Sequence, residues 1–135
     1  MNKLEPTKLE PAMYYILLGK IATKLYENRY GENFTDNLHV CEIEDIREFL
    51  KRATAVNIVD IEGNAVSDTY ELTNIDHLKA LYKFITDNGI FVMNPNNPCN
   101  HFTLCNILIM VASSNIDKFG EGNMLAIRVA PIMTN

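Results

Sequence analysis

Apolar residues recur every three or four positions from Pro11 onward, which is the spacing of one helix face. The pattern predicts a first helix that Gly31 stops, because glycine readily adopts the backbone conformation found just after a helix. Pro11 suits the first turn of this helix, where its missing N–H costs no hydrogen bond. Residues 1–10 lack the pattern, so we expect a flexible N-terminal arm ahead of a single domain over residues 11–135.

Helical spacing returns between Glu42 and Ala53, after a turn-rich loop at residues 31–37. Glu42 and two further acids would begin this second helix, and Lys51 with Arg52 would end it. Both sets of charges favour the helix dipole, which attracts acids to its N-terminus and bases to its C-terminus. The pattern therefore predicts a second helix that packs through its apolar face.

A pair of strand-like segments follows the second helix. β-branched residues dominate Val56–Ile61, and apolar positions resume in Ala65–Leu72. The residues between them, EGN at positions 62–64, have the composition of a turn. Together these segments predict a β-hairpin.

A third helix is predicted between Thr73 or Asn74, either of which can cap its start, and the pair Asn88 and Gly89, which closes it. The short polar side chain of a cap accepts hydrogen bonds from the first free N–H groups of a helix. Glycine then lets the chain leave the helix at its other end. Apolar residues at helical spacing fill the stretch between these signals.

Three apolar segments make up the last part of the chain. Ile90–Met93 predicts a short strand, and an asparagine- and proline-rich loop follows at residues 94–100. Thr103–Ala112 and Met124–Ile132 are nearly unbroken apolar runs, which predict two buried strands. The run at 103–112 also fits a buried helix, because periodicity does not separate the two; its β-branched content favours a strand.

The predicted elements come in the order ααββαβββ. This order is typical of an α+β domain, with three helices packed on one face of a curved, mostly antiparallel sheet. The chain has 135 residues, of which 47% are hydrophobic and 21% charged. A chain of this size and composition can bury a core without disulfides, so one domain is expected.

The cysteine count bears on the compartment in which the protein works. The chain contains three cysteines, Cys41, Cys99 and Cys105. A small secreted domain stabilised by disulfides usually has an even number of cysteines. We therefore expect a reducing, cytoplasmic location. The apolar stretch Ala12–Leu18 is short and follows acids and prolines, unlike a signal peptide or a membrane span, so no membrane partner is expected.

The net charge of −5 comes from one segment of the chain. Residues 53–78 contain no Lys or Arg and five acids, whereas the rest of the chain holds 12 acids and 12 bases. The five acids are Asp60, Glu62, Asp68, Glu71 and Asp76. An acidic chain is unsuited to binding phosphate backbones, so no direct nucleic-acid binding is expected. We expect a small intracellular binding or inhibitory protein, acting without a cofactor, whose acidic hairpin engages a protein with a basic surface.

Metal binding is an alternative use of two residue sets. His39 with Cys41 and Cys99 with His101 would supply the nitrogen and sulfur ligands that zinc prefers, although their i, i+2 spacing is not the usual one. The oxygen-bearing residues of the hairpin fall at positions 1, 3, 5, 9 and 12 of a twelve-residue window that starts at Asp60, as in a calcium-binding EF-hand. Ala65 stands where that loop needs glycine, so solvated hairpin acids explain the pattern better.

Cysteine chemistry offers the other alternative function. Cys99 or Cys105 with His101 would form a thiol and imidazole pair, which Asp117 can orient. The chain contains no P-loop, dinucleotide-binding, nucleophile-elbow or HExxH motif. The alternative is therefore a ligand-binding pocket protein or small enzyme with a cone-like sheet, in which His101 and Cys105 lie near the mouth of a cavity between the helices and the last strands.

Tyrosine and methionine side chains gather near the ends of the predicted elements. Tyr15 and Tyr30 lie outside the apolar stripe of the first helix. Both residue types are enriched at protein interfaces, so a homodimer is expected.

Overall fold

A computed structural model describes residues 11–31, 37–93, 108–120 and 124–129 of the chain. These residues form four helices and five strands, an α+β fold as predicted. The elements in chain order are α1 (Pro11–Tyr30), α2 (Asn37–Lys51), β1 (Ala55–Asp60), β2 (Tyr70–Glu71), α3 (Ile75–Asp87), β3 (Ile90–Val92), β4 (Leu108–Ser113), α4 (Ile116–Phe119) and β5 (Met124–Val129).

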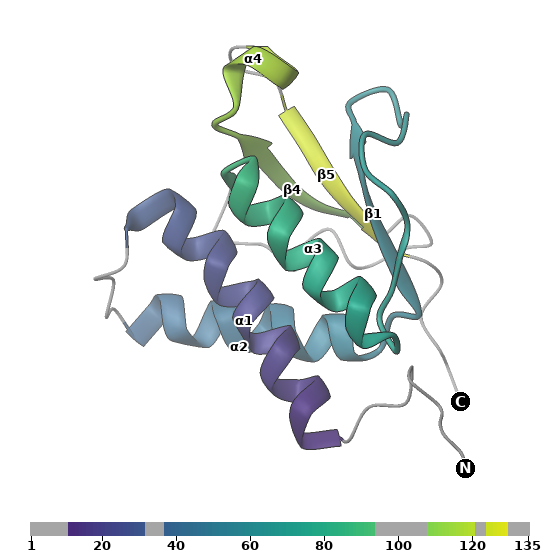
Figure 1. Ribbon diagram of the computed structural model, residues 1–135. Helices are drawn as coiled ribbons and strands as arrows, with labels where there is room; N and C mark the ends of the chain where they lie inside the picture. The colour runs from purple at the N-terminus through teal and green to yellow at the C-terminus, as the bar shows by residue number, and fades with distance from the viewer. Residues whose placement is uncertain (1–10, 32–36, 94–107, 121–123, 130–135) are drawn as a thin grey trace.

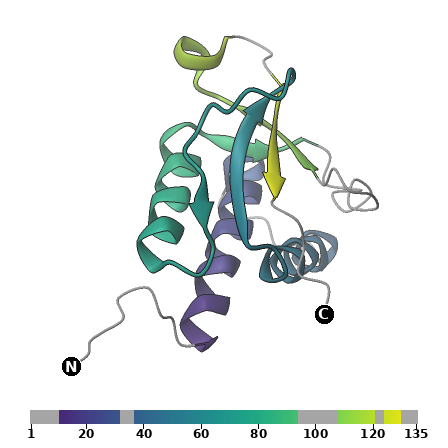
Figure 2. The ribbon, with the colours of Figure 1, turned by 90° about the vertical axis from the view of Figure 1, so that its right-hand side faces the viewer.

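The strands form one open antiparallel sheet in the order β2-β1-β5-β4-β3 (Figures 1 and 2). The last strand, β5, is inserted between β1 and β4, where Ile127 pairs with Ile58 on one side and Ile109 on the other. The short strands β2 and β3 lie at the two edges. The first and last strands of the described chain are thus neighbours at the centre of the sheet.

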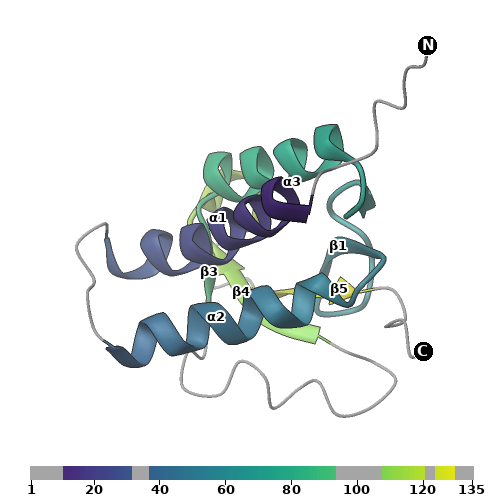
Figure 3. The ribbon, with the colours of Figure 1, turned by 90° about the horizontal axis from the view of Figure 1, so that it is seen from below.

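The long helices pack together on one side of this sheet, with α1 in contact with both α2 and α3 (Figure 3). Leu18, Leu25 and Tyr26 of α1 are fully buried in the core. They meet alternate residues of the strands, such as Ile58 and Ile127, whose side chains point to the helical side. Removal of these apolar side chains from water is the main stabilising term of the fold.

Helix ends follow the local signals in the sequence. Asn74 is the N-cap of α3, and its Oδ1 accepts hydrogen bonds from the backbone N–H groups of Asp76 and His77 at 2.9 and 3.3 Å. Gly31 has a φ of +85° directly after α1, and Gly89 has a φ of +57° between α3 and β3. Both glycines therefore adopt the backbone conformation that other residues avoid, as predicted for helix stops.

The second helix begins earlier than predicted, at Asn37 instead of Glu42. Its first turn consequently contains no acid, and the predicted match between Glu42 and the helix dipole is wrong. Glu42 is only 6% exposed, and the Tyr26 hydroxyl donates a 3.3 Å hydrogen bond to its carboxylate. Contact with α1 thus explains the position of this acid. Lys51 lies in the last turn, as predicted.

The predicted hairpin is present, but its second strand is much shorter than Ala65–Leu72. Val56 pairs with Tyr70 and Val59 with Ala65, so the returning chain uses two more residues than β1 to cover the same distance. Within this bulged stretch, Ser67 Oγ accepts the N–H of Ile58 at 2.9 Å in place of a backbone carbonyl. A side chain that replaces a strand partner explains why only two residues form β2.

Residues 108–112, the described part of the apolar run at 103–112, belong to strand β4. The predicted strand is thus confirmed for these residues, and the helix alternative is wrong for them. The loop after it contains the short helix α4, which the sequence pattern did not predict. Asn115 Oδ1 caps this single turn by accepting the N–H of Lys118 at 3.3 Å. No helix among the described residues has both the length and the apolar character needed to span a bilayer.

Candidate functional site

The five predicted site acids lie along one edge of the sheet. We define the acidic hairpin as residues 55–71, which comprise β1, the turn after it, the bulged stretch and β2. Asp76 follows in the first turn of α3. The short strand β2 is an edge strand of the sheet, and α3 lies beside it (Figure 2). Of the five acids, Glu62, Asp68, Glu71 and Asp76 are exposed and Asp60 is half-buried.

The carboxylate of Asp60 builds the turn instead of facing outward. Its Oδ1 accepts the backbone N–H groups of Glu62 and Asn64, both at 2.9 Å. Two backbone hydrogen bonds close the same turn, from Asp60 N–H to the Asn64 carbonyl and from Gly63 N–H to the Asp60 carbonyl. These N–H donors, that of Asn64 foremost, hold the pKa of the Asp60 carboxyl below its ordinary value. Asp60 therefore fixes the shape of the tip.

A cation that the sequence does not place near the hairpin reaches its tip from β5. The Arg128 guanidinium donates a 3.0 Å hydrogen bond to the Gly63 carbonyl. Arg128 lies 65 positions further along the chain, and only the pairing of β5 with β1 brings it there. The guanidinium braces the backbone of the turn. The acidic segment is thus free of bases in sequence but not in space.

The outer edge of β2 is closed by groups from α3. The N–H of Glu71 donates to His77 Nδ1 at 2.9 Å, and the carbonyl of Glu71 accepts the N–H of Asn74 at 3.0 Å. Because Nδ1 is the acceptor, the neutral imidazole carries its proton on Nε2. An edge strand with both outward groups occupied cannot pair with another strand. Backbone pairing of a partner strand is therefore blocked at Glu71.

The calcium and zinc hypotheses find no support in the described residues. Among these, no group of three or more His, Cys, Asp or Glu side chains is placed to hold a metal ion. The oxygens of the EF-hand-like window belong to the hairpin, where Asp60 is turned to backbone N–H groups. His39 and Cys41 fall within α2, but their side chains are not described, and Cys99 and His101 lie outside the described residues. The zinc site stays a prediction.

The predicted cavity between the helices and the last strands also stays a prediction. His101 and Cys105, expected at its mouth, lie outside the described residues, as do all residues from 94 to 107. On the described strands, Ile109, Val111 and Ile127 are buried in the core. They belong to the same hydrophobic core as the buried side chains of the helices.

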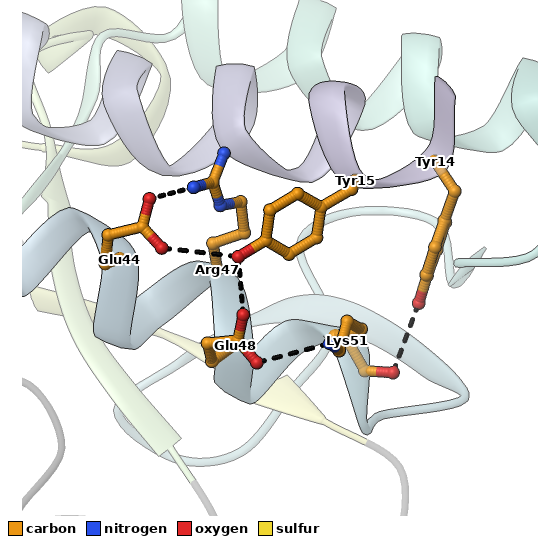
Figure 4. Close-up of polar contacts among 6 residues, drawn as sticks. All are labelled: Tyr14, Tyr15, Glu44, Arg47, Glu48 and Lys51. Atoms are coloured by element: carbon orange, nitrogen blue, oxygen red, sulfur yellow. Dashed lines mark hydrogen bonds and ion pairs between the residues drawn. The ribbon is translucent and has the colours of Figure 1, made fainter. Parts of the chain in front are cut away.

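A polar cluster that the sequence pattern did not predict joins α1 to α2 (Figure 4). The Tyr15 hydroxyl of α1 donates to Glu48 of α2 at 2.5 Å. The Arg47 guanidinium lies over the Tyr15 ring, 3.9 Å from its centroid, and pairs with Glu44. Lys51 pairs with Glu48 at 3.3 Å. The regular spacing of these charges along α2 is the sequence signal, but their common partner on α1 is visible only in the structure.

The chemistry of this cluster is structural. Each carboxylate already has a cation partner, Glu44 with Arg47 and Glu48 with Lys51. The hydrogen bond from Tyr15 lowers the pKa of Glu48, so this carboxylate is a weaker proton acceptor than an ordinary glutamate. The pKa of Tyr15 is raised by the same hydrogen bond. A charge-paired cluster without a free base is suited to joining two helices and unsuited to acid or base catalysis.

An open groove of about 520 Å³ runs beside this cluster on the outer side of the helices. It is lined by Ile16, Gly19, Lys20, Thr23, Glu27, Ile43, Glu44, Arg47 and Tyr82. Both acids in this lining already pair with cations. Glu27 pairs with Lys24 at 3.0 Å, and Glu44 pairs with Arg47. These two acids therefore do not mark the groove as a site for a cationic ligand.

The acidic hairpin remains as the candidate functional site, because it combines exposed carboxylates with a rigid turn. Among the described residues, none of the exposed acids Glu62, Asp68, Glu71 and Asp76 forms an ion pair. Comparison of the chain with protein-family models, with curated proteins and with solved structures found no match in any of the three.

Proposed function

We propose that this protein is a binding protein whose acidic hairpin engages a basic surface of another macromolecule. The observation that carries the proposal is the group of exposed acids without ion-pair partners in the described chain. A basic partner gains favourable charge contacts with them and breaks no existing ion pair. Such charges raise the association rate of a positively charged partner and disfavour a negatively charged one, and they act over several ångströms.

The construction of the hairpin supports the same function. The turn is held by four backbone-directed hydrogen bonds that involve Asp60, Gly63 and Asn64, and Arg128 adds a fifth from β5. A surface that is already ordered loses little conformational entropy on binding. The carboxylate of Glu62 is therefore displayed from a turn whose backbone is already held by hydrogen bonds.

Charge reversal on the hairpin tests this proposal, with Asp60 left unchanged because its carboxylate holds the turn. The test variant is Glu62→Lys with Asp68→Lys. The matched control is Asp45→Lys with Asp87→Lys, which makes the same change in net charge at exposed positions on α2 and α3. Asp87→Lys removes the ion pair between Asp87 and Lys83. This loss is small, because an exposed ion pair within one helix contributes only about 0.5 kcal/mol to stability.

The assay is affinity purification from the native host, followed by identification of each captured protein. We expect the wild type and the control to retain a basic protein that the hairpin variant loses, and we expect raised salt to release it. Circular dichroism checks that all three proteins are folded. Retention of the same proteins by the hairpin variant would rule out the hairpin as the binding site.

A further inference from the structure

Ile61, at the tip of the acidic hairpin, is the most exposed large apolar side chain in the described chain. Its side chain is 75% exposed, directly between Asp60 and Glu62. Turns usually carry Gly, Asn, Asp or Ser, because glycine accepts a positive φ and the other three side chains hydrogen-bond the nearby backbone. Most of the apolar area of this isoleucine is therefore not used by the fold and is available to a partner.

Two further exposed apolar side chains lie at the same end of the molecule. Asp60 pairs with Leu125 as the last pair of β1 with β5, so Ile61 follows β1 and Met124 begins β5 at the same end of the sheet. Met124 is 37% exposed, and Ile116 in α4 is 57% exposed. Figures 1 and 2 both show α4 and the turn after β1 at the end of the sheet where β5 begins. Exposed apolar groups thus accompany the carboxylates of the hairpin.

We propose that the tip binds a protein segment that presents apolar side chains flanked by lysine or arginine, with Ile61 as the central apolar contact. This inference rests on the proposed function and specifies the partner. Interfaces of this kind place an apolar contact at the centre, where water is excluded, and charged contacts around it. Ile61 and Met124 supply the centre, and Glu62, the residue after Ile61, supplies an exposed carboxylate beside it.

Charge determines which occupant fits this surface. A second copy of the chain, docked tip to tip about a two-fold axis, would bring Glu62 against Glu62 and Asp68 against Asp68. Like charges in close contact weaken an interface, whereas cations on the partner would pair with the same carboxylates. The acidic surroundings of Ile61 therefore favour a cationic segment over a second copy.

Two synthetic peptides test the inference, Lys-Lys-Leu-Leu-Lys-Lys and Lys-Lys-Gly-Gly-Lys-Lys, both with blocked ends. Each is titrated into the full-length protein at low ionic strength, and amide chemical shifts are followed by NMR. We expect the leucine peptide to shift the amides around Ile61 and Met124 and to bind about tenfold more tightly than the glycine peptide, the effect of burying part of an isoleucine side chain. Ile61→Ser should remove this difference.

Ile16→Ser is the matched control, because Ile16 is 53% exposed on α1, away from the hairpin. It should keep the preference for leucine. Equal binding of both peptides at the hairpin would overturn the apolar contact and leave the charge-based function standing. Absence of any shift at the hairpin with either peptide would overturn both. Loss of a dimer on Ile61→Ser, seen by sedimentation equilibrium, would identify a second copy as the occupant and overturn the inference.

Discussion

Asn28 of α1 forms hydrogen bonds to α3 and to edge strand β3. Its replacement by alanine tests how strongly these bonds hold β3 and the end of α3 to α1. Its Nδ2 donates hydrogen bonds to the Ile85 carbonyl at 3.2 Å and to the Ile90 carbonyl at 2.9 Å. The Ile85 carbonyl lies at the end of α3, where the N–H of Gly89 donates to Thr86 instead. The Ile90 carbonyl belongs to edge strand β3. Both acceptors depend on the Asn28 amide.

The magnitude follows from these two hydrogen bonds. Each contributes about 1 kcal/mol net, so Asn28→Ala should lower the free energy of unfolding by about 2 kcal/mol. For a domain of this size the melting temperature should fall by roughly 5 to 8 °C. Asn28→Asp keeps the size of the side chain, but its carboxylate can only accept hydrogen bonds and would face two carbonyl oxygens. It should therefore lower the free energy of unfolding at least as much as Asn28→Ala.

Urea unfolding followed by circular dichroism measures these changes. Asn57→Ala is the matched control, because the half-buried Asn57 side chain makes no hydrogen bond within the described parts of the chain. Its substitution should change stability by less than about 0.5 kcal/mol. The role assigned to Asn28 would be refuted if Asn28→Ala unfolded at the same urea concentration as the wild type or as Asn57→Ala.

Three further substitutions test other contacts. Gly89→Ala should cost at least about 1 kcal/mol, measured by urea unfolding, because alanine disfavours a φ of +57° and its Cβ would collide with Ser114 Oγ. Asp60→Asn should destabilise the protein at neutral pH, and this loss, measured by melting temperature, should shrink as the pH falls through the folded-state pKa of Asp60. The reason is that the depressed pKa makes the Asp60 contribution present above its ordinary value of 3.8 and lost as the pH falls through the folded-state pKa. Gly19→Leu should destabilise the wild type more than an Arg47→Ala background, because a Cβ at Gly19 would lie 2.7 Å from Arg47 Nη1; equal losses in the two backgrounds would contradict this.

The candidate site shows which functional features a sequence can reveal. The five acids are recognisable as a charge segment, because composition is a property of the chain itself. The separate role of Asp60 is not, since it depends on which N–H groups its carboxylate meets in the folded turn. Ile61 belongs to a run of β-branched residues that predicts a strand, yet β1 ends one residue earlier and leaves Ile61 exposed.

Local sequence patterns predicted the three long helices, most strands and the N-cap of α3, but neither α4 nor the start of α2. The signals of the predicted elements are local: side chains repeat every 3.6 or 2 residues, and a cap such as Asn74 bonds N–H groups two and three positions away. The tertiary structure decided the partners across the chain, such as Arg128 with Gly63 and Asn28 with Ile90, which are 65 and 62 positions apart. A local pattern specifies which face of an element is buried, whereas distant contacts arise only when all the elements pack together.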